Sequence, residues 1–261
     1  MKRTFYLFTI LLTSLILASC KKDSPDNPHS AGTLTDICGN TYNYVKIGSQ
    51  YWMAENMRCN RYDTKSEMAG KTITQTDGYY VPTYFVAYDK TKWTSNAKNE
   101  TGLNLSEKQI ESLGYLYNWA AAVAIEDKNQ QTSFKEKRQG ICPNGWHVPT
   151  SSEWELLGNT LGGNKDSDGT FYSIGKDLKT TSGWYVGSGT DKYGFSALPA
   201  GSGTGTSVWS VGQYTNFWTA TNTGSKAILY SLRGTTNDLI CSYEISLEVW
   251  AEQKSVRCVK D

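Results

Sequence analysis

One short stretch restricts how this chain can fold, because it combines a cysteine with the beginning of a helix. Residues 142–154 read CPNGWHVPTSSEW. Pro149 ends the segment before it, and Thr150 with Glu153 three positions later forms the capping-box pattern of a helix N-terminus. The residues that follow carry an apolar stripe at helical spacing, formed by Trp154, Leu157 and Leu161. Glycines at 162–163 end the pattern, so the sequence predicts one helix directly after this stretch.

A β-hairpin is predicted near the start of the folded region. Residues 41–56 read TYNYVKIGSQYWMAEN, in which polar and apolar residues alternate around a central Gly-Ser pair. A two-residue loop that begins with glycine suits a tight hairpin turn. With that loop, Ile47 faces Gln50. The same register, extended outward, places Cys38 opposite Cys59. A disulfide between them is expected if the pairing extends that far, and two free thiols are the alternative.

In the rest of the chain, the hydrophobic periodicity is weak in some segments and clear in others. Residues 60–113 are polar and weakly periodic, which indicates an insertion or extended loop system with possible short strands at 79–81 and 84–86. An alanine-rich run with apolar residues at helical spacing predicts a second helix over 115–125. The C-terminal half breaks into short aromatic pieces between glycines. It predicts strands at 217–221, 226–232, 240–247 and 255–259.

The N-terminus has the pattern of an export signal. A basic start precedes an apolar run, Phe5 to Leu17, that is too short to span a bilayer as a permanent helix. The order Leu-Ala-Ser-Cys that ends at Cys20 resembles the bacterial lipobox, in which the cysteine is lipid-modified and becomes the mature N-terminus. An ordinary secretory signal is the alternative. The expected organisation is a lipoprotein signal peptide at 1–19, a flexible tether at 20–34 and one folded domain at 35–261.

Charge and composition exclude one class of partner and leave another open. Lys and Arg number 26 and Asp and Glu number 25, a net charge of +1, and no basic tract follows the tether. Nucleic acid is therefore not expected as a partner, because phosphate binding needs a concentrated positive surface. Nine tryptophans and seventeen tyrosines supply either core volume or rigid platforms for sugars and peptides. Composition does not separate those two uses.

Several segments occur in an order that resembles a known family. They are the run from Gly39 through Trp52 to Asn56, GICPNGWHVPTSSEW, GFSALPAG at 194–201, FWTAT, and the closing SVRCVKD. Together they are similar to the Fibrobacter succinogenes major paralogous domain family, found in exported proteins of Fibrobacter and Bacteroidetes. The resemblance covers about residues 35–261. It departs from the usual family pattern at Cys38, at Cys59 and in the long 60–113 segment.

That family in turn is similar to the C-type lectin-like fold. The resemblance implies an α+β architecture: two helices packed on a small, twisted, mostly antiparallel sheet with long loops, here preceded by the N-terminal β-hairpin. It also implies a disulfide from just before the second helix to the last strand, and Cys142 and Cys258 occupy those two places. Cys241 then stays unpaired, and we expect it to be a small buried side chain within a strand.

No residue is expected to act in catalysis or to bind a metal or cofactor. His147 lacks a partner marked by local sequence, so we expect a buried ring that is hydrogen-bonded to backbone. Residues 148–154 resemble a helix entry of the formylglycine-generating enzymes, but the shared element is structural. Residues 164–169 match the first half of a calcium loop, yet position 175, where the closing glutamate belongs, is glycine. An acidic turn is therefore expected there.

Ligand binding is expected in the glycine-rich loops of residues 163–216. The candidate contact residues are Tyr185, Tyr193, Trp209 and Tyr214, and core packing is the alternative role for these rings. The expected function is that of a lipid-anchored protein of the cell envelope, at the outer membrane and exposed on its surface, that binds a glycan or protein for adhesion or surface assembly. A structural envelope component without a small ligand is the second hypothesis. An enzyme on a scaffold like that of the formylglycine-generating enzymes is the third.

Overall fold

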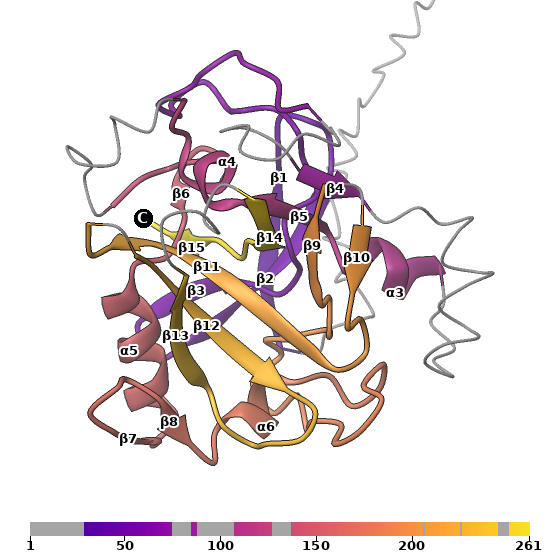
Figure 1. Ribbon diagram of the computed structural model, residues 1–261, viewed down its shortest axis with the longest axis vertical. Coiled ribbons are helices and arrows are strands. Elements are labelled where there is room, and N and C mark those ends of the chain that lie inside the picture. The colour runs from indigo at the N-terminus through magenta and orange to yellow at the C-terminus, as the bar shows by residue number, and fades with distance from the viewer. Residues whose placement is uncertain are drawn as a thin grey trace, which may run out of the picture.

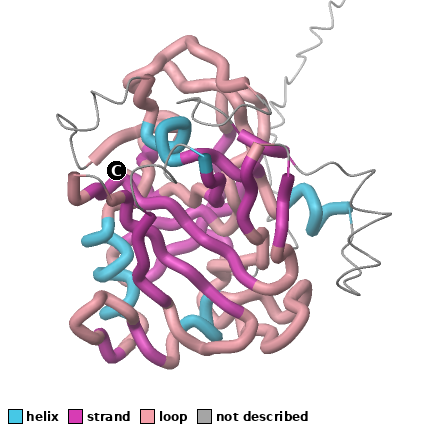
Figure 2. The backbone as a smooth tube through the Cα atoms, viewed as in Figure 1, coloured by secondary structure: helices cyan, strands magenta, loops and turns pink. Residues whose placement is uncertain are grey.

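The structure of the protein is a computed structural model that describes residues 29–74, 85–87, 107–126, 137–205, 207–224, 226–244 and 251–261 (Figures 1 and 2). The expected signal peptide at 1–19, Cys20 and the possible strand at 79–81 lie outside these residues. The tether expected up to residue 34 ends earlier, because Ser30–Thr35 forms strand β1. Among the described residues, no helix has the length and apolar character needed to cross a membrane.

A five-stranded sheet, called the first sheet below, contains the predicted hairpin. Its strands lie in the order β1-β2-β3-β15-β6. They span Ser30–Thr35 (β1), Thr41–Ile47 (β2), Gln50–Met53 (β3), Val259–Lys260 (β15) and Trp146–His147 (β6). The predicted register is confirmed, since Ile47 lies opposite Gln50 and Gly48 takes the positive φ of the turn. Cys38 and Cys59 form the expected disulfide, with 5.7 Å between their Cα atoms.

A larger, eight-stranded sheet fills the rest of the domain. Six of its strands lie in the order β10-β9-β14-β11-β12-β13, and β5 joins β14 to β4. They span Phe85–Ala87 (β4), Tyr115–Asn118 (β5), Ser202–Thr204 (β9), Ser207–Trp209 (β10), Tyr214–Asn222 (β11), Ala227–Arg233 (β12), Ile240–Glu244 (β13) and Glu252–Ser255 (β14). A two-stranded sheet pairs β7, Asn164–Lys165, with β8, Phe171–Tyr172. The strands predicted in the C-terminal half are present, although the one predicted at 255–259 divides into β14 and β15.

The helices are short. They span Glu107–Ser112 (α3), Trp119–Val123 (α4), Ser151–Thr160 (α5) and Gly175–Leu178 (α6). The helix predicted after residues 142–154 is confirmed as α5. Its N-cap is Thr150, and both hydrogen bonds of the capping box with Glu153 are present.

The single helix predicted over 115–125 is wrong in its first half. Residues 115–118 form β5, because Leu116 lies opposite Ser255 and Asn118 opposite Gln253 of β14. The side chain of Asn118 then caps α4, and Ala124 ends that helix in the left-handed region. A strand partner far along the chain therefore overrides the local helical pattern.

The predicted C-type lectin-like α+β fold is also wrong, and the architecture is a β-rich sandwich. In the described part of the chain only α5 reaches ten residues, and the other helices have four to six. Strands of the two main sheets supply more of the regular secondary structure than the helices do, as Figure 2 shows in magenta and cyan. Short helices cannot cover such sheets by themselves, so the aromatic side chains of strands and loops fill the core instead.

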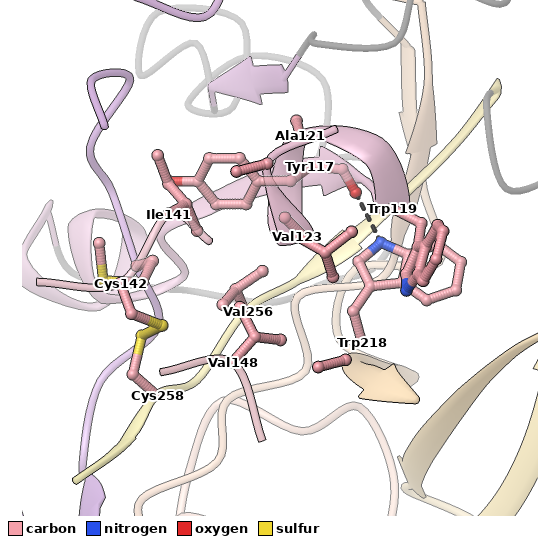
Figure 3. Packing of buried hydrophobic residues seen from close by; sticks show 14 of the residues in the cluster. Tyr117, Trp119, Ala121, Val123, Ile141, Cys142, Val148, Trp218, Val256 and Cys258 are labelled. Carbon is pink, nitrogen blue, oxygen red and sulfur yellow. Dashed lines mark hydrogen bonds between the residues drawn. A yellow bond between two sulfur atoms is a disulfide. The ribbon is translucent and has the colours of Figure 1, made fainter. Parts of the chain in front are cut away.

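One core cluster surrounds α4, whose residues are all buried. Figure 3 shows how it is held: the indole N–H of Trp218 donates to the carbonyl of Tyr117 at 2.7 Å. The disulfide between Cys142 and Cys258, which the family resemblance implies, lies in the same cluster.

The second cluster is rich in aromatic side chains and lies where α5 meets β12. Trp154 stacks on Tyr230 with ring centres 5.2 Å apart. Trp52 is 4.8 Å from Trp154, and Phe217 is 5.4 Å from it. These rings come from both main sheets and from α5, so one aromatic cluster fixes the relative positions of all three.

Removal of either disulfide should destabilise the domain, and the long bridge should matter more. Cys142 and Cys258 are 116 residues apart in sequence, whereas Cys38 and Cys59 are 21 apart. On the loop-entropy model, the double substitution C142S/C258S lowers the free energy of unfolding by about 5 kcal/mol and C38S/C59S by about 3 kcal/mol. Chemical denaturation of both variants measures this difference. Equal losses, or a larger loss for C38S/C59S, would contradict the assignment of the long bridge as the main covalent restraint.

Candidate functional site

Exposed apolar side chains occur on one loop and on the neighbouring edge strand β10 of the larger sheet. Tyr185 is 62% exposed, Val186 is 52% exposed and Trp209 is 37% exposed. With half-buried Tyr214 they form a set that we name the aromatic rim. The other exposed large apolar side chains among the described residues are Leu156, Tyr172 and Tyr243. Isolated apolar residues on a surface need no explanation, so the question is whether the rim residues share one rigid support.

Backbone hydrogen bonds join the segments that carry the rim. The N–H of Tyr185 donates to the carbonyl of Gly212 at 2.7 Å, and the N–H of Gly201 donates to that of Tyr214 at 2.7 Å. The N–H of Gly234 in turn donates to the carbonyl of Gln213 at 2.7 Å. The loops therefore form a connected support, although they lack long regular elements.

Two glycines allow the loops to approach each other this closely. A Cβ atom at Gly187 would collide with the carbonyl oxygen of Gly234, and one at Gly234 would collide with that of Val186. Gly187 also has φ +67, in the left-handed region that glycine adopts without strain. Any larger residue at these two positions would separate the loops.

The individual ring positions follow from the strands. On β10, Val208 packs against the cluster that contains Leu198 and Val211, so the next residue, Trp209, points outward. Tyr214 begins β11 and lies opposite the exposed Arg233 of β12.

Tyr193 does not belong with the other predicted contact residues. It is half-buried against the second core cluster, and the ammonium of Lys192 lies 5.2 Å from its ring centre. Backbone contacts therefore connect the segments that carry Tyr185, Trp209 and Tyr214, whereas Tyr193 takes part in core packing.

A buried lysine that no sequence pattern indicated, Lys179, contacts the segments that carry the rim. The ammonium of Lys179 donates to the carbonyl of Arg233 at 3.0 Å and to that of Thr236 at 2.9 Å. It also lies 5.2 Å from the ring centre of Trp184. Burial lowers the pKa of Lys179, and the positive charge of Lys176 lowers it further. Lysine is usually exposed, and no sequence pattern marks Lys179 as buried, so only the tertiary structure identifies it.

His147 is buried, as predicted, but its partners are side chains and not backbone groups. Its Nδ1 is 2.6 Å from Oδ1 of Asp261, and its Nε2 is 2.7 Å from Oε1 of Glu153. The ring is 2% exposed, so both nitrogens are enclosed. This histidine joins β6 to α5 and to the end of β15, which is a structural role.

Two groups of side chains in the described residues could offer ligands to a metal ion, but their ligand atoms already have other partners. Asp36, Cys38 and Cys59 lie close together, but the two thiols form the disulfide and Asp36 accepts from Tyr42 and Asn40. In the 164–169 turn, Asp166 accepts from the backbone N–H groups of Asp168 and Thr170 at 2.9 Å. The acidic turn predicted there thus binds its own backbone.

Cys241 is free but only half-buried. Its N–H donates to the hydroxyl of Thr170, and Gly169 packs against its side chain. The acidic turn covers only one side of β13. This thiol is therefore less buried than predicted.

The interaction between Glu153 and His147 should make the free energy of unfolding depend on pH in the acid range. Burial acts to raise the pKa of Glu153, but hydrogen bonds from His147 and Thr150 lower it overall. A carboxyl whose folded pKa is depressed stabilises the fold above its unfolded value and loses that contribution as the pH falls through the folded value. E153Q keeps a capping side chain but no charge, so it should lower the free energy of unfolding at pH 7 by about 1 kcal/mol and flatten the loss of stability below about pH 4.5.

Denaturation of both proteins between pH 7 and pH 2 measures this effect. E155Q is the matched control, because Glu155 lies on the same helix and pairs with Lys165 at the surface. Parallel profiles for E153Q and the unchanged protein would refute the contribution of this carboxylate.

The comparison with known proteins agrees with the motifs in the sequence. The family model described as the Fibrobacter succinogenes major domain matches residues 45–260. No curated protein and no solved structure gives a significant match. The matched range includes the larger sheet, α5, the aromatic rim and the first sheet apart from β1 and the start of β2, and most of the chain lies within it. The chain therefore belongs to the Fibrobacter succinogenes major domain family.

Proposed function

We propose that this protein is a lipid-anchored component of the cell envelope whose β-rich domain binds a glycan or protein through the aromatic rim. The observation that carries the proposal is the exposure of Tyr185 and Trp209 on loops that backbone hydrogen bonds and close glycine contacts hold together. Adhesion or surface assembly is the biological role that such binding serves.

The physical argument rests on what an exposed ring can do. Most large aromatic side chains of this domain stack in the core, as Trp154 does with Tyr230. The rings of Tyr185 and Trp209 make no ring-stacking contact within the described part of the chain, so their faces are available. Aromatic rings lose few rotamers on binding and contribute large contact areas to sugars and peptides. A rigid support lowers the entropic cost further.

The anchor and the location are supported by the N-terminal sequence. The basic start, the apolar run and the Leu-Ala-Ser-Cys order at 17–20 support lipid attachment at Cys20. The domain would then stand at the outer membrane, facing ligands outside the cell. Nucleic acid is not proposed as a partner, because the net charge of +1 supplies no concentrated positive surface.

Substitution of either exposed ring should weaken ligand binding without unfolding the domain. Truncation of a central anchor removes about 2 kcal/mol or more of binding free energy, so Y185A and W209A should each raise Kd at least about tenfold. A glycan and glycoprotein array probed with the chain from residue 21 identifies the ligand, and calorimetry then gives Kd. Melting temperatures should stay within a few degrees, because both side chains are exposed.

Y243A is the matched control, because Tyr243 is 55% exposed and lies on β13, outside the rim. Binding that survives Y185A and W209A together, or that Y243A weakens equally, would argue against the rim. An array with no binding would favour the structural envelope component instead.

Attachment to the membrane is tested separately through Cys20. C20A should abolish incorporation of labelled fatty acid and leave an unprocessed or soluble chain, because the thiol is the lipid acceptor. C241S is a suitable control, since it removes the free thiol of the folded domain. Fatty-acid labelling that persists in C20A would refute the anchor.

A further inference from the structure

A row of four side chains crosses the first sheet, one from each of four neighbouring strands. Lys46 of β2 lies directly opposite Tyr51 of β3. Lys260 of β15 lies directly opposite Trp146 of β6. The register between β3 and β15 makes Lys260 the neighbour of Tyr51 as well. These residues are called the lysine–aromatic row.

The row lies on the face of the first sheet that points away from the second core cluster. Val45 and Trp52, which point to the opposite face, are buried in the second core cluster. Lys46 and Lys260 are exposed, and Tyr51 is half-buried. Trp146 is buried in the core cluster around α4, and Tyr51 packs against that cluster, so solvent reaches the row at its two lysines and at part of the Tyr51 ring.

Two ammonium groups lie near the same ring of the row. The ammonium of Lys46 is 5.5 Å from the ring centre of Tyr51, and that of Lys260 is 5.4 Å from the same centre. Tyr44 extends the aromatic surface, since its ring centre is 5.9 Å from that of Tyr51 and 5.3 Å from that of Trp146. Like charges repel, so a nearby anion would stabilise this arrangement.

Among the described residues, no carboxylate lies within salt-bridge distance of either ammonium. The closest in sequence, Asp261, is already bound to His147 at 2.6 Å and to Lys137 at 3.6 Å. Surface lysines elsewhere do have such partners, as Lys165 has in Glu155 at 2.7 Å. The row therefore presents positive charge that no carboxylate of the described residues neutralises.

We propose that the lysine–aromatic row binds an acidic glycan, a linear chain of sugars that bear carboxylates. The backbones of β2 and β15 are two strand spacings apart, roughly 10 Å, which suits carboxylates on alternate sugars of such a chain. Lysine ammoniums accept a carboxylate from several directions because each is a compact point charge. The rings of Tyr44 and Tyr51 offer apolar surface to the C–H faces of the sugars. This site is distinct from the aromatic rim and does not depend on it.

Calorimetric titration of the mature chain with tetragalacturonate tests the proposal, with uncharged galactotetraose as the comparison probe. We expect binding of the acidic oligosaccharide alone, weakened as salt is added. K46Q/K260Q should raise Kd about tenfold, because both exposed charge contacts are lost while the side-chain stems remain. K226Q is the matched control, since the ammonium of Lys226 lies 4.0 Å from the ring centre of Tyr243 on β13.

The outcomes separate this site from other possibilities. Loss of tetragalacturonate binding in K46Q/K260Q but not in K226Q or Y185A supports the row. No binding, equal binding of galactotetraose, or an equal effect of K226Q overturns it. Binding to vesicles of anionic phospholipid in place of tetragalacturonate also overturns it, since the row would then contact a membrane. None of these results decides whether the aromatic rim binds its own ligand.

Discussion

The guanidinium of Arg257 carries a positive charge into the middle of the domain, and both main sheets depend on how it is held. It donates to Oδ1 of Asn56 at 2.7 and 3.1 Å and to the carbonyls of Phe195 and Ser196. Its plane also lies over the ring of Phe195, 4.4 Å from the centre. Burial lowers the pKa of Arg257 to about 9, and the charges of Asp191 and Glu55 oppose that shift. Because β14 precedes this residue and β15 follows it, the same contacts set where one sheet passes into the other.

The other buried cations are held in a similar way. Lys179 uses two carbonyls and the face of Trp184, while Lys254 combines Glu252 at 2.6 Å with the face of Trp218. Backbone carbonyls thus replace the usual carboxylate for Lys179, backbone and amide oxygens replace it for Arg257, and an aromatic face contacts all three cations. The same pairing of lysine with aromatic ring appears in the lysine–aromatic row of the first sheet, where both lysines are exposed. A buried contact of this kind stabilises the fold, whereas an exposed one can take part in recognition.

The features that sequence predicted correctly are those set by neighbouring residues. The hairpin register follows from the Gly48 turn, and α5 follows from Thr150 and Glu153. Features set by distant residues escaped prediction. Residues 115–118 have a helical pattern but become a strand because β14 is beside them, and His147 finds its two carboxylates only when β6, α5 and β15 meet. Exposure of Tyr185 and burial of Tyr193 likewise depend on loop packing that composition does not encode. The resemblance predicted the family and the Cys142–Cys258 bridge correctly, but the fold class that it implied is wrong.

The position of β14 and β15 along the chain has a consequence for biogenesis. Every strand that they pair with, from β3 to β11, precedes them in sequence, and so does Cys142. A polypeptide that emerges from the ribosome N-terminus first therefore lacks a strand in the middle of each main sheet until this late segment is available. Such a domain remains incompletely folded throughout its synthesis. For the proposed export, a translocation channel that admits only unfolded chains could accept it, and both sheets would close after the crossing, in an oxidising compartment that permits disulfides.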